Sequence, residues 1–200
     1  SSSTTSDVLY INSGDQVDLS AVGNLLNIPL SVNFNDGTIG TGWVNSVVPD
    51  FTNPGCVGGS SDGTTFMWMG TNPSPRNLTS SDFDTSGGGV ISFDIKFAEQ
   101  YGGNPCEGPD LVDEGVYLQY SINGGTSWQT IHYFFPSFYT DGSSHLQNWK
   151  NYVFKIPQLA ETAATSFRLT QQDISSSSTD HWGLDNIVIG LENPTSISWD

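Results

Sequence analysis

The sequence predicts an all-β fold: a β-sandwich of the jelly-roll type, made of two antiparallel sheets with little or no helix. Apolar and polar residues alternate along several short segments, and Gly and Pro stand between these segments. A long helical pattern is missing, and residues 159–164 could form at most one helical turn. Several short strands separated by turn residues are typical of a sandwich or jelly roll. Two hundred residues suffice for one sizeable core.

The first predicted strands are short and flank clear turns. Residues 7–11 and 16–20 lie on either side of Asn12-Ser13-Gly14, and residues 64–69 follow the turn Ser61-Asp62-Gly63. Residues 90–97 give the clearest alternation. Four apolar residues at every second position define its core face: Ile91, Phe93, Ile95 and Phe97. Asp94 and Lys96 occupy the opposite face.

Residues 116–121 alternate in the same way and lead into a predicted hairpin. The connecting sequence, residues 121–128, contains Asn123-Gly124-Gly125 and ends on Trp128. Asn-Gly supplies the positive φ angles of a tight turn, and the Trp can pack back over it. This segment resembles an Asp-box hairpin, which we interpret as a folding device rather than a ligand site.

Residues 152–156 and 166–171 are the next strands, and residues 182–190 form the last. The last strand contains one carboxylate, Asp185, among the apolar residues Leu184, Ile187 and Ile189. Burying a lone carboxylate is costly unless something neutralises it. A bound cation such as Ca²⁺ would do so, since it takes carboxylate and carbonyl oxygens as ligands. The alternative is a carboxylate hydrogen-bonded to backbone N–H groups.

The charge balance restricts the partners. The chain has 21 acidic and 5 basic residues, a net charge of -16. Nucleic acid is excluded as a partner because phosphate binding needs Lys and Arg, and an anionic membrane surface would repel the chain. No apolar stretch of about 18 residues occurs, so membrane insertion is not expected.

Catalysis is not expected either. Residues 59–63 match Gly-x-Ser-x-Gly, but that motif works on a strand-to-helix turn of an α/β sheet, which this sequence does not predict. One loop gathers four acidic residues: Glu107, Asp110, Asp113 and Glu114. Such a loop could hide a glycosidase pair, hold a cation, or simply be solvated.

Cys56 and Cys106 are the only cysteines, and both lie in Gly- and Pro-rich segments. Their positions lack the Cys-x-x-Cys spacing of a zinc or redox site. A disulfide closing a loop of about 50 residues would stabilise the fold by roughly 2–4 kcal/mol. It would also indicate a secreted setting. Two free thiols are the alternative.

Several segments, in this order, resemble the jelly-roll subdomain of reelin-type repeats and, more distantly, MAM domains. They are Asn33-Phe34-Asn35-Asp36-Gly37 with Gly42-Trp43, Gly55-Cys56, residues 91–95, residues 115–128 and residues 182–187. The resemblance runs from about Ser31 to Gly190 and implies a non-catalytic domain that binds a structural Ca²⁺. Asp185 matches the family's carboxylate on the last strand. Asn33 and Asn35 fall at positions where MAM-like sequences have acids; Asp36 and Asp62 complete the implied ligand set.

The flanks suggest neighbouring domains. Residues 12–21 resemble the opening strands of Ig-like or PKD-like domains of large bacterial surface proteins, and residues 194–199 resemble the point where such a domain resumes. We therefore expect residues 23–192 to form the jelly roll. Residues 1–22 are either its N-terminal edge strands or the flank of a neighbouring domain. Residues 193–200 start a following β-domain or a linker.

The expected function is a Ca²⁺-stabilised recognition or adhesion module of a secreted or cell-surface multidomain protein. Its partner would be a glycan or a protein on another surface, with neighbouring β-domains in the same chain. One alternative is a carbohydrate-binding module of a secreted polysaccharide-degrading enzyme, and another is a spacer without a ligand. For sugar binding, the aromatic segment 132–142 and its neighbours offer a ring-and-polar set: Tyr139, Asp141, His145 and Trp149. The same aromatic residues could instead cover the open end of the sandwich.

Overall fold

The computed structural model describes residues 30–52, 59–60, 62–70, 72–98, 107–136 and 145–190. The predicted strands at 7–11 and 16–20, both cysteines with their proposed disulfide, and the two flanks lie outside these residues. The expected domain division and the disulfide therefore stay predictions.

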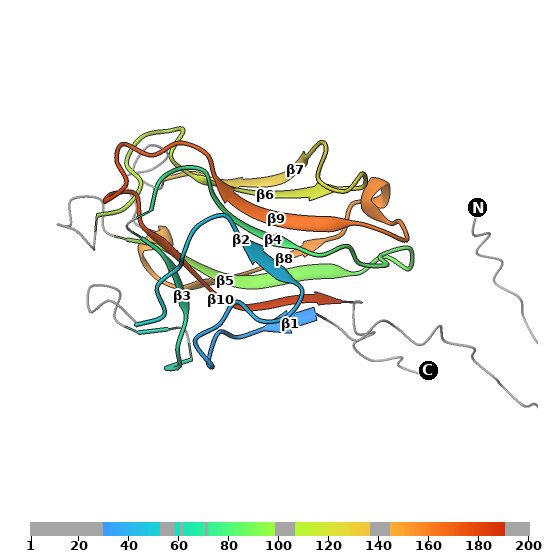
Figure 1. The fold of residues 1–200 in the computed structure, drawn as a ribbon, viewed down its shortest axis with the longest axis horizontal. Coiled ribbons are helices and arrows are strands. Elements are labelled where there is room, and N and C mark those ends of the chain that lie inside the picture. Colours follow the sequence, from blue (N-terminus) through green and yellow to red (C-terminus); the bar gives the residue numbers. More distant parts are fainter. Residues whose placement is uncertain are drawn as a thin grey trace, which may run out of the picture.

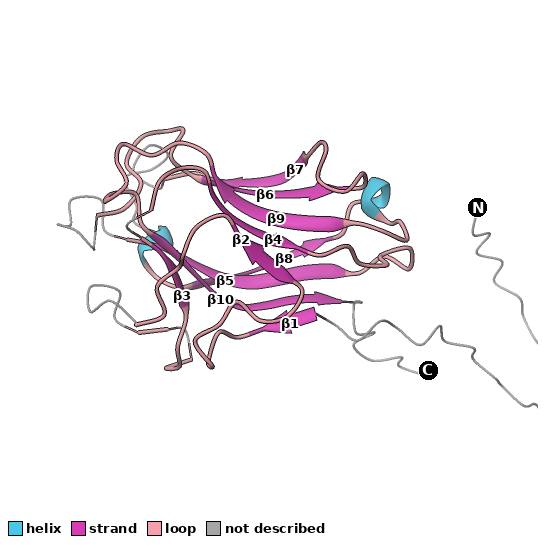
Figure 2. Ribbon diagram, in the orientation of Figure 1, coloured by secondary structure: helices cyan, strands magenta, loops and turns pink. Residues whose placement is uncertain are grey.

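The described residues fold into two antiparallel sheets of five strands each, which pack face to face (Figures 1 and 2). The first sheet has the order β1-β10-β5-β8, with β3 also paired to β10. Its strands are β1 (Leu30–Val32), β3 (Met67–Met69), β5 (Val90–Phe97), β8 (Lys150–Lys155) and β10 (Trp182–Gly190). The second sheet has the order β2-β4-β9-β6-β7. Its strands are β2 (Trp43–Asn45), β4 (Arg76–Ser80), β6 (Val116–Ser121), β7 (Gln129–Phe134) and β9 (Ser166–Gln171).

The predicted fold class, an all-β sandwich of two antiparallel sheets, is confirmed. The helical content of the described residues is limited to two 3₁₀ turns, η3 (His145–Gln147) and η4 (Gln158–Ala160). The second of these overlaps the start of the segment that the sequence allowed as a helical turn. Gly124 and Gly125 have φ angles of 64° and 81° in the β6–β7 connection, so glycine supplies the positive φ angles of the predicted hairpin.

The core lies between the sheets and is built from the inward side chains of both. The predicted core face of β5 is buried, with Ile91, Phe93 and Ile95 at 0% exposure. Phe93 packs edge-on against Phe134 of β7, with ring centroids 5.8 Å apart. Apolar side chains from opposite sheets thus lose their water contact together, which is the main favourable term in such a fold.

The aromatic segment that begins at His132 is partly strand rather than loop. His132 and Phe134 lie on the inner face of β7 and contact β8 of the other sheet. The Phe134 and Tyr152 rings are 5.0 Å apart, and the His132 and Phe154 rings are 5.1 Å apart. These contacts close the side of the sandwich between the edge strands β7 and β8, one from each sheet.

β10 is the strand that positions the acidic residues. One edge of β10 pairs with β5 throughout, with a register shift between Asp185 and Val188. Its other edge pairs first with β3, over residues 182–184, and then with β1, over residues 187–189. Asp185 and Asn186 therefore sit where the edge partner changes and the β5 ladder is interrupted. Asn186 has a φ of 50°, a left-handed conformation that Asn tolerates better than most residues.

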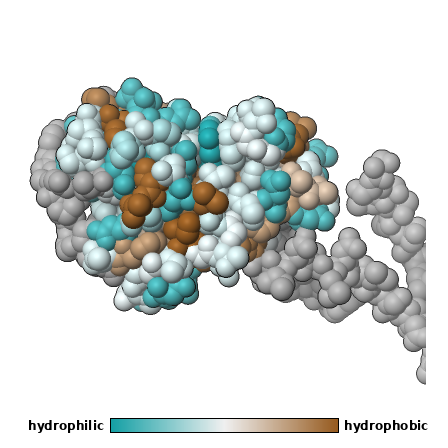
Figure 3. Space-filling view, viewed as in Figure 1, coloured by the Kyte–Doolittle hydropathy of each residue, from teal (hydrophilic) through white to brown (hydrophobic). Residues whose placement is uncertain are grey.

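The surface is mixed. On the face shown in Figure 3, apolar residues form small patches among polar ones, which is ordinary for a folded domain. Within the described residues, no helix has the length and apolar character needed to cross a membrane.

Candidate cation site

Asp185 lies in the middle of β10 with 0% exposure. It stands opposite Asp94 of β5 in the sheet register, so the two side chains share the outer face of the first sheet. Asp185 Oδ1 accepts a hydrogen bond of 2.8 Å from the backbone N–H of Asn186. Asp185 Oδ2 is buried and has no hydrogen-bond partner among the described residues. The backbone-bonded alternative thus accounts for one oxygen of this carboxylate and leaves the other unexplained.

Asn186 links three carboxylates at this point. Its Nδ2 donates to Asp94 Oδ2 at 3.1 Å and approaches Asp62 Oδ2 at 3.4 Å. Asp94 Oδ1 also accepts from Asn151 Nδ2 of β8 at 2.9 Å. Asp62 belongs to the segment that leads into β3, so the chain brings it to β10 through the β3–β10 pairing. The polar side chains at this point thus come from β5, β8, β10 and the loop before β3.

The carboxylates differ in their electrostatics. Burial raises the pKa of Asp185 to about 7, and repulsion from Asp62 and Asp94 adds to the effect. Asp62 is exposed, and hydrogen bonds from the hydroxyl and backbone N–H of Thr64 and from Ser60 lower its pKa to about 2. A carboxylate that ionises readily thus stands beside a buried one that resists ionisation. A cation at this point would relieve both the repulsion and the desolvation of Asp185.

The donor set fits a hard cation. The available ligands are carboxylate oxygens, and Ca²⁺ takes oxygen ligands in flexible geometry. Asp185 and Asp94, opposite each other in the register, would supply charged oxygens, and the exposed Asp62 lies on the other side of the Asn186 amide from Asp94.

Asn33, Asn35 and Asp36, the other ligands implied by the family resemblance, lie in the turn that follows β1 and are exposed. The Asn33 side chain accepts from the backbone N–H of Asn35 at 3.3 Å, and Asp36 accepts from the backbone N–H of Thr38 at 3.0 Å. These bonds are local to the turn. β1 pairs with β10 through Val32 and Ile187, which places the start of the turn beside Asn186. Their part in binding an ion stays a prediction.

Asp94 is the residue that sequence reasoning did not include in the site. The alternation of residues 90–97 placed it on the face opposite the core, and the structure agrees. Sequence alone gave no sign that this outer face is covered, whereas the structure buries Asp94 to 8% exposure. Only the pairing of Asp94 with Asp185 identifies it as a candidate ligand.

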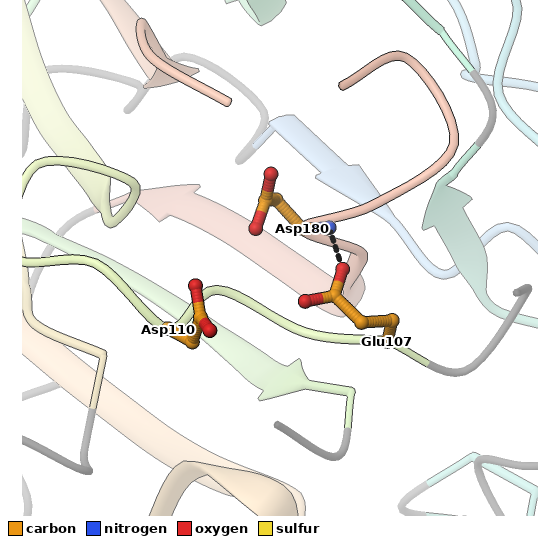
Figure 4. A group of neighbouring side chains, drawn as sticks. All are labelled: Glu107, Asp110 and Asp180. Atoms are coloured by element: carbon orange, nitrogen blue, oxygen red, sulfur yellow. Dashed lines mark hydrogen bonds between the residues drawn. The ribbon is translucent and has the colours of Figure 1, made fainter. Parts of the chain in front are cut away.

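A second acidic group lies at the loops before β6 and β10. Glu107, Asp110 and Asp180 each offer one carboxylate oxygen, and these three atoms all lie within 4.8 Å of one another (Figure 4). Burial raises the pKa of Glu107 to about 7, with repulsion from Asp180 and Asp110 adding to it. Burial likewise raises the pKa of Asp180 to about 6, with repulsion from Glu114 as a further cause. This group could hold a metal ion.

The residues predicted for sugar binding are only partly described. Tyr139 and Asp141 lie outside the described residues, and the backbone of His145 begins η3. Trp149 is half-buried: its Nε1–H donates to the carbonyl of Gly59 at 2.6 Å, and its ring packs edge-on against Phe66, with centroids 5.1 Å apart. Trp149 thus helps to fix the segment at Gly59 onto the sandwich. Its part in a ligand site stays a prediction.

Two packed antiparallel sheets, with acidic groups in and just before the last strand, define a jelly-roll β-sandwich domain with oxygen-rich loops. Residues 52–190 match the family model of reelin subrepeat B. The chain therefore belongs to the reelin subrepeat B family, and the resemblance predicted from the sequence is confirmed.

Solved structures agree on the fold. The K1 cleaved adhesin domain of Lys-gingipain from Porphyromonas gingivalis W83 is similar with a TM-score of 0.52 and 14% identity, over 84% of this chain and 100% of that one. The K2 cleaved adhesin domain of Lys-gingipain gives a TM-score of 0.52 and 12% identity, over 81% of this chain and 99% of that one. At these identities the likeness shows the fold alone.

A family 22 carbohydrate-binding module of Clostridium thermocellum Xyn10B is similar with 15% identity over 84% of this chain and 95% of that one. Its TM-score is 0.46, and a likeness this weak carries no functional argument.

Proposed function

We propose that this domain is a non-catalytic recognition module of a secreted or cell-surface multidomain protein, and that Ca²⁺ bound at Asp185 stabilises it. The supporting observation is the fully buried Asp185 carboxylate, whose Oδ2 lacks a hydrogen-bond partner in the described part of the chain. Asp94 and Asp62 lie beside it. An ion here would join β5, β10 and the loop before β3, so its role is to hold the sandwich together rather than to perform chemistry.

Thermal unfolding with and without Ca²⁺ tests this proposal. A ligand that binds only the folded state stabilises it by about 2.7 kcal/mol at one hundred times its Kd. In a domain of this size, each kcal/mol raises the Tm by about 2–4 °C, so we expect a rise of roughly 5–11 °C from chelator to saturating Ca²⁺.

The informative variant is Asp185→Asn, because an amide keeps the size of the side chain and an acceptor for the Asn186 N–H. We expect a distinctly smaller Ca²⁺-dependent rise in this variant. Asp82→Asn is the matched control, since Asp82 is an exposed carboxylate in the β4–β5 loop and should keep the wild-type response. A full wild-type rise in Asp185→Asn would refute the site.

A second candidate is binding of a glycan by the outer face of the second sheet. Tyr117 of β6 and Tyr133 of β7 stand opposite each other on this face, with ring centroids 4.2 Å apart. Gln119 of β6 and Arg168 of β9 are paired next to Tyr117, and Arg168 Nε donates to Gln119 Oε1 at 2.7 Å. The Arg168 guanidinium lies 4.2 Å from the centroid of the Trp128 ring. Rings beside amide and guanidinium groups are the chemistry that binds pyranose faces and hydroxyls. These side chains support a glycan as a second candidate ligand for this face.

A glycan array with soluble plant, fungal and bacterial polysaccharides tests the second candidate. Binding that is lost in Tyr117→Ala and kept in Tyr152→Ala, a tyrosine at the edge of the core, would support this face. Loss in Tyr139→Ala instead would move the site to the aromatic segment after β7. Absence of binding to every polysaccharide would remove the carbohydrate hypothesis and leave a protein partner.

A further inference from the structure

The acidic group before β6 and β10 comes from two distant parts of the chain. Glu107, Asp110 and Glu114 belong to the loop that leads into β6, whereas Asp180 lies near the end of the loop that leads into β10. The backbone N–H of Asp180 donates to Glu107 Oε2 at 2.8 Å, which joins the two loops directly. Figure 4 shows the carboxylates of Glu107, Asp110 and Asp180 turned toward one shared space.

Asp180 carries an oxygen that its surroundings leave unsatisfied. The side chain has 0% exposure, and its Oδ2 accepts from the backbone N–H of Ser175 at 2.6 Å and from Thr179 Oγ1 at 2.8 Å. Its Oδ1 is buried and lacks a hydrogen-bond partner among the residues described. An unsatisfied oxygen on a buried carboxylate is costly, and other carboxylates nearby increase that cost. A cation bound at this oxygen would offset that cost.

The neighbouring basic side chains do not meet this need. Arg76 is fully buried behind the loop, yet every hydrogen bond that it donates ends on a carbonyl or amide oxygen. Two of these acceptors are the main-chain oxygens of Asp180, at 2.7 Å, and Thr179, at 2.9 Å. The ring of His181 lies between Trp68 Nε1 and the carbonyl of Ser178, at 3.3 and 2.9 Å. Arg76 and His181 thus bind the backbone and the core rather than the carboxylates.

Glu114 fixes the shape of the loop through both of its carboxylate oxygens. Its Oε2 accepts from the backbone N–H groups of Asp110 and Leu111, at 3.0 and 2.8 Å, and its Oε1 accepts from Ser175 Oγ at 2.5 Å. The loops before β6 and β10 are thereby fixed to each other. Asp110 and Asp180 are carried by the two segments that Glu114 connects.

We propose that Glu107, Asp110 and Asp180 bind a second Ca²⁺, separate from the ion proposed at Asp185, and that Glu114 is a positioning residue for this site. The donors are all oxygens, which favours Ca²⁺ over Zn²⁺, whose protein sites prefer nitrogen and sulfur. Ca²⁺ binds oxygen at about 2.3–2.6 Å, so one ion can span oxygens up to about 5 Å apart. The three carboxylate oxygens of this group lie within 4.8 Å of one another, which is inside that range. Mg²⁺, with bonds of about 2.0–2.1 Å, spans only about 4 Å and demands stricter geometry.

The test is the number of Ca²⁺ ions bound per chain, measured by equilibrium dialysis of the full 200-residue protein against CaCl₂ with metal analysis. We expect two ions in the wild type and one in Asp180→Asn. Asn at this position keeps an acceptor for Ser175 and Thr179, so near-ultraviolet circular dichroism should show a folded chain. Asp113→Asn, an exposed acid of the same loop, is the matched control and should keep two ions.

The two proposed sites can fail separately. Asp185→Asn should bind one ion, and the double variant Asp180→Asn/Asp185→Asn should bind none. If a folded Asp180→Asn chain binds as many ions as the wild type, the second site is refuted whatever Asp185→Asn does. Should Asp180→Asn not fold, Asp110→Asn decides instead, because Asp110 is half-buried and its loss leaves the Glu114 bonds to the backbone in place. Two ions bound to Asp110→Asn at wild-type affinity would overturn the proposal.

Discussion

Arg76 should stabilise this domain strongly, and its replacement by Met tests that expectation. The side chain has 0% exposure, and burial lowers its pKa only to about 10, so it is charged at neutral pH. Its guanidinium joins β4 to the loop before β10 through the carbonyl oxygens of Thr179 and Asp180. It also donates to Gln171 Oε1 at 3.0 Å, and that oxygen in turn accepts from Trp182 Nε1 at 2.9 Å.

Met fills much of the same volume but donates no hydrogen bond. The substitution takes a donor from the part-buried carbonyl oxygens of Asn72 and Thr179, and it removes the positive charge that attracts Asp180 and Glu107. A hydrogen bond to a charged group contributes about 1.5–3 kcal/mol, so the loss of several of them should cost about 3–5 kcal/mol. For a domain of this size that corresponds to a fall in Tm of about 6–20 °C.

Urea unfolding followed by circular dichroism, at pH 7 and fixed Ca²⁺, measures the effect. The matched control is Arg168→Met, because Arg168 is half-buried on the outer face, where it bonds Gln119 and lies over Trp128. We expect that control to cost only about 0.5–1.5 kcal/mol. Equal losses in the two variants, or a loss below about 1 kcal/mol in Arg76→Met, would show that the buried network is not what stabilises this end of the sandwich.

Three further results are expected. In chelator, the wild type should lose a few kcal/mol more stability than Asp185→Asn between pH 4.5 and 7.5, measured by urea unfolding. The folded-state pKa of Asp185 is about 7, above the ordinary value of 3.8, so the folded state keeps this proton at a pH where the unfolded state has lost it. The free energy of unfolding therefore falls as the pH rises through that window. Parallel curves of stability against pH for the two proteins would contradict this prediction. Gly183→Ala should lower the Tm by several degrees, because its Cβ would lie 2.7 Å from Trp68 Cε3, and an unchanged Tm would contradict this packing. Gly124→Ala, at a φ of 64° in open space, should cost only about 1 kcal/mol in urea unfolding; a larger loss would mean that the turn has packing contacts.

The sequence predicted the strands whose inward positions are apolar. The expected strands at 90–97 and 166–171 coincide with β5 and β9, because period-two alternation is strong there. β4 was missed. Its inward positions are Arg76, Leu78 and Ser80, so the alternation that marks a strand is mostly polar on the core side. β1 and β2 have three residues each, too few to show a period.

The candidate site residues also fall into those that the sequence could single out and those that it could not. Asp185 could be singled out because it interrupts an apolar run, and the acids of residues 107–114 are close together in sequence. Asp180 gave no such signal. It is 73 residues from Glu107, and only the fold makes them neighbours.

The sequence by itself determined the fold class, the family and the presence of one carboxylate that burial makes costly, since these depend on local periodicity and residue type. The tertiary structure decided which acids meet. Strand register pairs Asp94 with Asp185, and the return of the chain before β10 brings Asp180 to Glu107 and Asp110. Electrostatic repulsion and desolvation depend on distance and burial, which residue spacing along a β chain does not fix.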